Sequence, residues 1–300
     1  MNDKPALSLA AVPGRRRKTL EMAQEIEARG YAGIYCPSLG DCMSLCAGIA
    51  QATSTIRFGT SVAPIYFRLV EDYAASAAFI HEISEGRFDF GIGVSHDRVL
   101  RQRDVRVGKP LADIRAFVAR LREVPRVGEL PPIVLAALRE RMIKLATEIS
   151  DGLVLANAAM SHIPRALQGA AAAAGPNAFF IGNMIPTCVH DKVEVAREVN
   201  RKTLTSYAYL PNYRNYWRQA GYGEEMDAVE QFLADGKPEA VGACLSDRWI
   251  DDVTIAGPAS LVKERVANWR EAGVKTPILV PSSANGGQLV AFDELFAVFD

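Results

Sequence analysis

The segment Gly91–His96 holds the residue types best suited to chemistry, because a mostly apolar run of strand length leads there into two glycines and a Ser-His pair. Glycines at such a point let backbone N–H groups approach a ligand closely. A histidine at a strand end can exchange a proton near neutral pH. The segment predicts a ligand-binding turn at Gly93, Val94 and Ser95, with His96 as a candidate proton donor; the alternative is a loop histidine that faces water.

Two familiar motifs do not fit this segment. As the dinucleotide-binding pattern G-x-G-x-x-G it has His96 at the third glycine position, and the charged stretch that follows is unsuited to start a packed helix. As a hydrolase nucleophile turn it lacks the second glycine of G-x-S-x-G. Ser95, His96 and Asp97 are also consecutive, whereas a catalytic triad needs residues that converge in space. A dinucleotide fingerprint and a serine hydrolase are both disfavoured.

Three further strand ends carry candidate ligand contacts. Small residues interrupt the strand within Phe58–Pro64, which predicts close backbone approach. Asn157 ends another strand and offers a donor and an acceptor to a heterocycle. A third turn leads into a helix whose N-terminal N–H groups could hold a phosphate together with a guanidinium; its residues are Ala136, Ala137, Leu138 and Arg139. The alternative for this turn is a solvated helix start.

The elements that must position these residues alternate along the whole chain. Strand-length apolar runs are followed by segments of helical period, the pattern of parallel strands joined by helices. The expected strands are Ala6–Val12, Gly33–Pro37, Ile56–Pro64, Arg87–Gly93, Pro132–Leu138, Gly152–Asn157, Ala178–Val189 and Pro277–Pro281. The expected helices include Thr19–Arg29, Leu111–Leu121, Arg141–Ile149 and Leu261–Trp269.

Eight such units in 300 residues match the size of an α/β TIM (β/α)8 barrel, which typically needs about 250 residues. We therefore predict one domain spanning residues 1–300. The surplus is the aromatic-bearing stretch 203–252, expected to be a helical insertion before the last strand that either covers a barrel end or forms a lid or dimer contact. A doubly wound open sheet is the alternative, because periodicity does not show whether a parallel sheet closes.

Composition excludes several classes of protein. The 34 Lys and Arg against 35 Asp and Glu give a formal net charge of -1, which argues against a nucleic-acid-binding protein. No apolar run reaches the roughly 18 residues of a membrane span, and no signal-peptide pattern is found, so we expect a cytoplasmic protein. The five cysteines favour reduced thiols, and the spacing of Cys36, Cys42 and Cys46 lacks the pattern of a zinc site. We expect no metal site.

Three blocks of the sequence resemble the bacterial luciferase-like superfamily of flavin- and deazaflavin-dependent oxidoreductases. They are Phe58–Pro64, Ser84–Gly93 and Ile149–Val154, and the resemblance covers most of the chain. The most recognisable is the Ser-Gly-Arg-Phe signature, here with Glu85 inserted after Ser84. The pairing of Gly93–His96 with the later segment Gly108–Leu111 is similar to the probable deazaflavin-dependent branch, while an FMN-using relative stays open as an alternative.

The resemblance implies a TIM-barrel enzyme that forms a homodimer and transfers a hydride between a reduced deazaflavin, coenzyme F-420, and a small organic substrate. It implies a bulge with a non-prolyl cis peptide at Ser61–Val62 that backs the cofactor ring. It places ring or phosphate contacts at the turn Gly93–Ser95 and phosphate contacts at the turn Ala136–Arg139. His96 stands where relatives often carry a Glu, so the resemblance leaves it as the catalytic candidate.

Two departures from the family pattern keep further alternatives open. Pro37-Ser38-Leu39 stands where related dehydrogenases carry an Asp-His pair, and Leu138-Arg139 replaces two glycines of the phosphate turn. An FMN-dependent monooxygenase of the same fold is one alternative. A flavin-binding protein without turnover is the other.

Overall fold

The computed structural model describes residues 4–95, 100, 108–173 and 179–300, and the chain divides into two compact units. The first unit comprises residues 1–155 and 169–182, and the second comprises residues 156–168 and 183–300. Candidate residue His96 and the charged stretch after it lie outside the described residues, apart from Leu100.

The first unit is built on parallel, buried strands in the order β1-β2-β3-β5-β6-β7, with β4 beside β5. Their bounds are β1 Ala6–Ser8, β2 Ile34–Cys36, β3 Phe58–Thr60, β4 Ala63–Pro64, β5 Phe88–Gly93, β6 Ile133–Ala136 and β7 Gly152–Ala156. The registers Ile34↔Phe58, Phe58↔Phe88 and Phe90↔Ile133 carry one apolar layer from strand to strand. Because the strands are parallel, their carboxyl ends share one edge, where the candidate turns lie.

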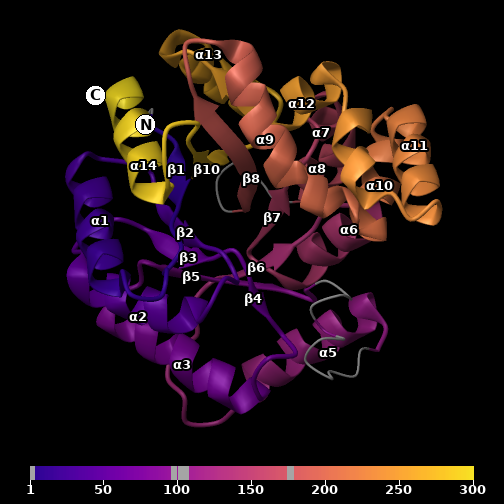
Figure 1. Ribbon diagram of the computed structural model, residues 1–300. Coiled ribbons are helices and arrows are strands. Elements are labelled where there is room, and N and C mark those ends of the chain that lie inside the picture. The colour runs from indigo at the N-terminus through magenta and orange to yellow at the C-terminus, as the bar shows by residue number, and fades with distance from the viewer. Residues whose placement is uncertain (1–3, 96–99, 101–107, 174–178) are drawn as a thin grey trace. The chain divides into compact units, whose positions relative to one another are not determined.

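Helices follow the strands of this unit and cover their outer side (Figure 1). They are α1 Arg16–Ala28, α2 Cys42–Ala52, α3 Val70–Ile83, α5 Pro110–Glu123, α6 Glu140–Ile149 and α8 Gln168–Ala173, the last beginning at the boundary of the unit. In α1 the residues Met22, Ala23 and Ile26 are buried at the helical period. The helix stops before Gly30, whose φ of 71° is the left-handed conformation that favours glycine after a helix end.

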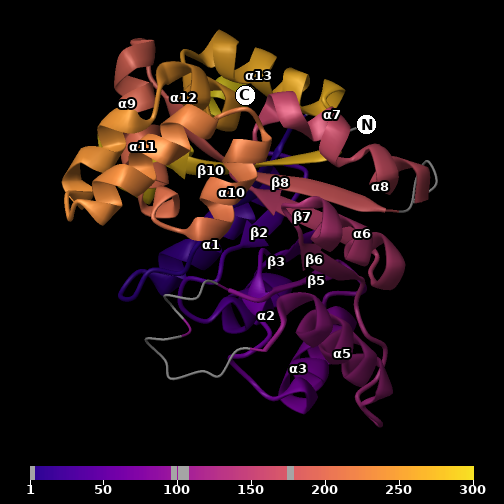
Figure 2. The same cartoon turned by 90° about the vertical axis from the view of Figure 1, so that its right-hand side faces the viewer.

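The second unit holds most of β8 and the helical insertion. Its elements are η1 Met160–His162, α7 Ile163–Ala166, β8 Phe180–Val189, α9 Val193–Ala208, α10 Pro211–Gln219, α11 Gly223–Ala234, η2 Pro238–Cys244, α12 Asp247–Val253, β9 Ile255–Gly257, α13 Ala259–Glu271, β10 Thr276–Ser282 and α14 Gln288–Phe299. β8 begins in the first unit and pairs with both β9 and β10. Figures 1 and 2 show α9, α10, α11 and α12 gathered side by side.

The predicted fold class is confirmed: the chain is an α/β TIM (β/α)8 barrel with a helical insertion before the last barrel strand. Each expected strand is present, the third being split into β3 and β4. Two details differ from the prediction. The helical excursion starts at Val193, ahead of residue 203, and the short strand β9 follows it. β9 pairs with the far end of β8, Thr187↔Ile255. The assignment of residues 1–300 to one domain stays a prediction.

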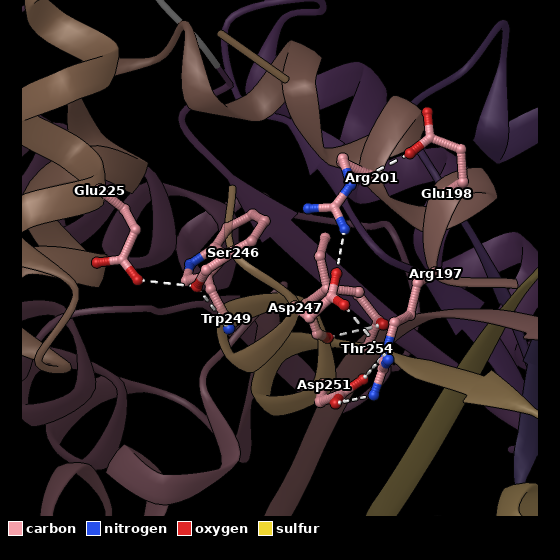
Figure 3. Close-up of polar contacts among 10 residues, drawn as sticks. Arg197, Glu198, Arg201, Glu225, Ser246, Asp247, Trp249, Asp251 and Thr254 are labelled. Carbon is pink, nitrogen blue, oxygen red and sulfur yellow. Dashed lines mark hydrogen bonds and ion pairs between the residues drawn. The ribbon is translucent and has the colours of Figure 1, made fainter. Parts of the chain in front are cut away.

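A network of ion pairs fastens α12 to α9 within the insertion (Figure 3). Arg197 binds Asp251 with Nε and Nη2, at 2.7 and 2.5 Å, and Arg201 donates from Nη2 to Asp247 at 2.5 Å. Ser246 caps α12 by accepting the Trp249 N–H at 3.2 Å. Networks of this kind hold surface helices in one geometry more effectively than isolated pairs do.

Among the residues that the structure describes, no helix combines the length and the apolar character needed to cross a membrane.

Candidate functional site

A β-bulge separates β3 from β4 at the carboxyl edge of the first unit. Gly59 pairs with Asp89 before it, and Ala63 pairs with Ile92 after it. Three residues on the β3–β4 side therefore face two on β5, which is the definition of a bulge. The predicted interruption of the third strand is confirmed, and the Ser61–Val62 peptide within it is cis, as the resemblance implied.

Both neighbouring strands hold the bulge. The Ser61 N–H donates to the Cys36 carbonyl of β2 at 2.7 Å. The buried Thr60 hydroxyl donates to the Gly91 carbonyl of β5 at 2.6 Å. The backbone of residues 60–62 is thus fixed from two sides, as a binding surface requires.

The glycines of β5 make room for the bulge. A Cβ on Gly91 would lie 1.8 Å from the Thr60 carbonyl oxygen. A Cβ on Gly93 would lie 2.8 Å from Val62 Cγ2 and 2.9 Å from Ala136 Cβ. Val62, Gly93 and Ala136 therefore meet at the ends of three adjacent strands and form a floor of small side chains, with Val62 and Ala136 only half-buried.

The turn after β5 contains a residue in the left-handed backbone conformation. Ser95 has a φ of 64°, a left-handed conformation uncommon for a serine. Val94 and Ser95 are half-buried, and the Gly93 carbonyl accepts the N–H of Ile65 at 2.9 Å. Ser61, Val62 and the Gly93–Ser95 turn thus share one edge of the first unit.

The predicted phosphate turn leads directly into α6. The Ala137 N–H is used by the sheet, donating to the Val154 carbonyl at 3.0 Å. Arg139 is the N-cap residue of α6, and the N–H groups of Met142 and Ile143 bond back to its carbonyl. The first N–H groups of a helix have no partner within it, so this start offers donors for an anion beside the exposed Arg139 side chain, with Leu138 half-buried before it.

Asn157 belongs to the second unit and contacts the insertion. Its φ is 54°, its carbonyl accepts the indole N–H of Trp217 at 3.0 Å, and its N–H donates to the Met184 carbonyl at 3.0 Å. Burial raises the pKa of Tyr207 and of Tyr213, and side-chain hydrogen bonds with Asn157 oppose that shift for both. Asn157 is therefore held by the aromatic side chains of α9 and α10 within the second unit.

Arg87, the arginine of the Ser-Gly-Arg-Phe signature, has a structural role and bonds separate segments of the chain together. Arg87 donates to Ser84 O, Ala50 O, Thr53 O, Thr53 Oγ1 and Ile56 O at 2.9 to 3.1 Å. Its guanidinium also lies 5.4 Å from the ring centre of Phe58. These contacts join the end of α2 and the loop before β3 to the turn before β5, at the amino edge of the sheet. Glu85 and Gly86 form that turn with positive φ values.

A buried polar group lies at the amino end of β5, and sequence reasoning missed it. The Asp89 carboxylate accepts from Arg57 at 2.5 Å and from the Tyr35 hydroxyl at 3.4 Å. Burial raises the pKa of Asp89, and Arg57 and Tyr35 partly oppose that shift. The three residues are far apart in sequence. The only sign of the group in the sequence was an acidic residue within an apolar strand.

The three cysteines weighed as ligands do come together. All are buried, and Cys46 is hydrogen-bonded to Cys36 with Cys42 close by. Burial raises the pKa of Cys42 to about 12 and that of Cys46 as well. Such thiols are protonated at neutral pH and poor nucleophiles.

A cavity of about 740 Å³ lies in the second unit and contains none of the predicted site residues. Its lining includes Glu198, Arg201, Lys202, Thr205, Ser246 and Asp247. Glu198, Arg201 and Asp247 are already paired with one another across it (Figure 3). Because none of the strand-end residues lines this cavity, the candidate site is placed at the β4–β6 edge.

Comparison with known proteins gives matches along nearly the whole chain. The luciferase-like monooxygenase family matches over residues 4–127 and 114–276. A protein of Mycobacterium tuberculosis, provisionally named a coenzyme F-420-dependent oxidoreductase, is 23% identical over 88% of this chain and 90% of its own length.

Two solved structures share the fold at low identity. The coenzyme F-420-dependent tetrahydromethanopterin reductase of Methanopyrus kandleri has a TM-score of 0.76 at 15% identity, covering 98% of this chain and 97% of its own. The oxygenating constituent of 3,6-diketocamphane monooxygenase of Pseudomonas putida, solved with FMN, has a TM-score of 0.61 at 17% identity, covering 92% of each chain.

Proposed function

Because the chain belongs to the luciferase-like monooxygenase family of oxidoreductases, we propose that it transfers a hydride between reduced coenzyme F-420 and a small organic substrate. The observation that carries the proposal is the floor of Val62, Gly93 and Ala136 beside the braced bulge. The name of the mycobacterial relative and that of the archaeal reductase support a deazaflavin as the cofactor.

The residues of this edge suit a planar ring with a phosphate tail. Gly93 admits the side chain of Val62, so the floor stays flat and apolar, as the face of a tricyclic ring requires. We propose ring contacts from Ser61, Val62 and the turn Gly93–Ser95. The N–H groups at the start of α6 and the Arg139 guanidinium would hold the phosphate, with Ala136, Ala137 and Leu138 shaping the approach. Asn157 is proposed as a further polar contact for the ring.

Each group then has a physical role. When bound, a reduced deazaflavin supplies the hydride. The Ser61–Val62 bulge orients the ring from behind, and the apolar floor excludes water from that face. The exposed cation at the α6 start neutralises phosphate charge and sets the orientation of the tail.

Titration of the purified protein with each cofactor tests this proposal. Oxidised F-420 should show saturable quenching of its fluorescence, and FMN should bind about tenfold more weakly, a difference of about 1.4 kcal/mol. Tighter binding of FMN would instead support an FMN-dependent monooxygenase, the alternative favoured by the FMN-bound relative. Binding of F-420 without turnover on a panel of alcohols, aldehydes and activated alkenes would indicate a flavin-binding protein.

His96 remains our proposed proton donor, from its sequence position alone. Replacing His96 with Ala should lower turnover about a hundredfold, because a positioned general acid typically contributes at least that factor. The affinity for F-420 should stay within a few fold, since the side chain acts on the substrate. Steady-state kinetics beside the same titration separate the two effects. Turnover within about threefold of the parent would reject the assignment.

We further propose that the enzyme is a cytoplasmic homodimer. The five cysteines are free, which suits a reducing compartment. The homodimer is what the family resemblance implies, and we propose that the exposed apolar side chains of Leu69 and Phe79, 69% and 58% exposed, take part in its contact.

A further inference from the structure

The bulge between β3 and β4 is shaped by one side-chain hydrogen bond. Thr60 is 2% exposed, and its hydroxyl donates to the Gly91 carbonyl at 2.6 Å. That bond lies where the pairing offset between the strands changes, after Gly59↔Asp89 and before Ala63↔Ile92. It therefore fixes the extra residue on the β5 side, where the ladder between β3 and β5 is interrupted, while the Ser61 N–H holds it on the β2 side.

The bond also lies next to the floor formed by Val62, Gly93 and Ala136. The closeness of Gly91 to the Thr60 carbonyl shows that the two strands are in backbone contact there, without room for a side chain. Two residues later the half-buried Val62 lies over Gly93 and next to Ala136. Thr60 therefore lies on the same short, tightly packed stretch of backbone that carries Val62 at the edge where the ring would rest.

We propose that Thr60 is a positioning residue for the cofactor: its hydroxyl holds the bulge so that Val62 presents a flat face to the ring. The inference rests on the proposed function, since it concerns the same site. Thr60 would not touch the ring and would act only through the Thr60–Val62 backbone. A valine has the same shape without the hydroxyl, whereas serine keeps the hydroxyl.

The test compares Thr60→Val and Thr60→Ser by fluorescence titration with oxidised F-420 and by circular dichroism of the bound cofactor. Thr60→Val should raise the Kd about tenfold, the usual effect of one buried hydrogen bond, and should change the induced signal of the ring. Thr60→Ser should restore the affinity to within a few fold. Thermal unfolding of each variant checks that both are folded.

Thr187→Val is the matched control. Thr187 is also a buried strand threonine whose hydroxyl donates to a backbone carbonyl, Ile185 O at 2.9 Å. It differs in its place, because it lies near the carboxyl end of β8 in the second unit, paired with Ile255 of β9. It should leave the Kd and the induced signal unchanged.

The inference is overturned if Thr60→Val binds as the parent does, if Thr60→Ser loses as much as Thr60→Val, or if Thr187→Val loses affinity equally. The proposed function fails separately, when the parent protein itself binds no F-420.

Discussion

Replacing Arg87 with Ala should lower the free energy of unfolding by about 3 to 5 kcal/mol, because a half-buried network of five charge-assisted hydrogen bonds is lost. Its guanidinium serves four backbone carbonyls and one hydroxyl, contributed by three segments of the chain. Alanine would leave these acceptors without their charged donor and would also remove the packing against Phe58. Urea unfolding followed by tryptophan fluorescence measures the loss.

Arg120→Ala is the control for this prediction. Arg120 is 66% exposed in its side chain and forms one pair with Glu71, which is 54% exposed. A pair of that kind contributes at most about 1 kcal/mol. If Arg87→Ala lowers the free energy of unfolding no more than Arg120→Ala does, Arg87 does not have this structural role. Arg87→Lys should recover only part of the loss, because three donors on a flexible stem do not match five planar ones.

Gly91→Ala is expected to destabilise the protein by at least about 3 kcal/mol and to abolish binding of F-420. The added Cβ would lie 1.8 Å from a backbone oxygen, so β3 and β5 must move apart. Backbone cannot swing aside as the end of a flexible side chain can, and the separation would break the Thr60 hydroxyl bond. Unfolding in urea and the cofactor titration report the two losses.

Gly223→Ala serves as the comparison. Gly223 is the first residue of α11, and a Cβ there meets nothing within 4 Å. Alanine is a better helix former than glycine, so the free energy of unfolding should stay equal or rise by up to about 1 kcal/mol. Equal effects at Gly91 and Gly223 would show that the close approach of β3 to β5 is not required.

The sequence predicted what local pattern determines. The alternation of apolar runs and helical periods predicted the barrel, and the expected helix Thr19–Arg29 corresponds to α1, because each signal is carried by residues close together in the chain. β9 was missed because its apolar run is only Ile255 and Ala256, shorter than the runs around the predicted strands, and because its partner is the carboxyl end of β8. Its existence depends on pairing, which a linear pattern does not show.

The site was predicted less completely, for the same physical reason. The bulge at Ser61–Val62 was expected from the family resemblance, while the hydroxyl of Thr60 that bonds across it was not, because its acceptor lies 31 residues away. The sequence likewise shows Asp89 only as an acid in an apolar strand, because its partners Arg57 and Tyr35 are distant in the chain. The role of Arg87 was missed because most acceptors of its guanidinium lie 31 to 37 residues away in the chain.

The bulge has a consequence for which side of the sheet each residue faces. Along β5, Asp89 and Ile92 project to opposite faces, since successive side chains alternate. Gly59 and Ala63 have the same parity in their own strand, yet they pair with those two opposite residues. The third strand therefore consists of two halves, β3 and β4, in which the alternation of side chains between the two faces of the sheet is shifted by one residue. Because the bulge takes up the extra residue, substitutions at the half-buried Ser61 and Val62 should leave the pairing of Gly59 with Asp89 in place and turn no core side chain outward.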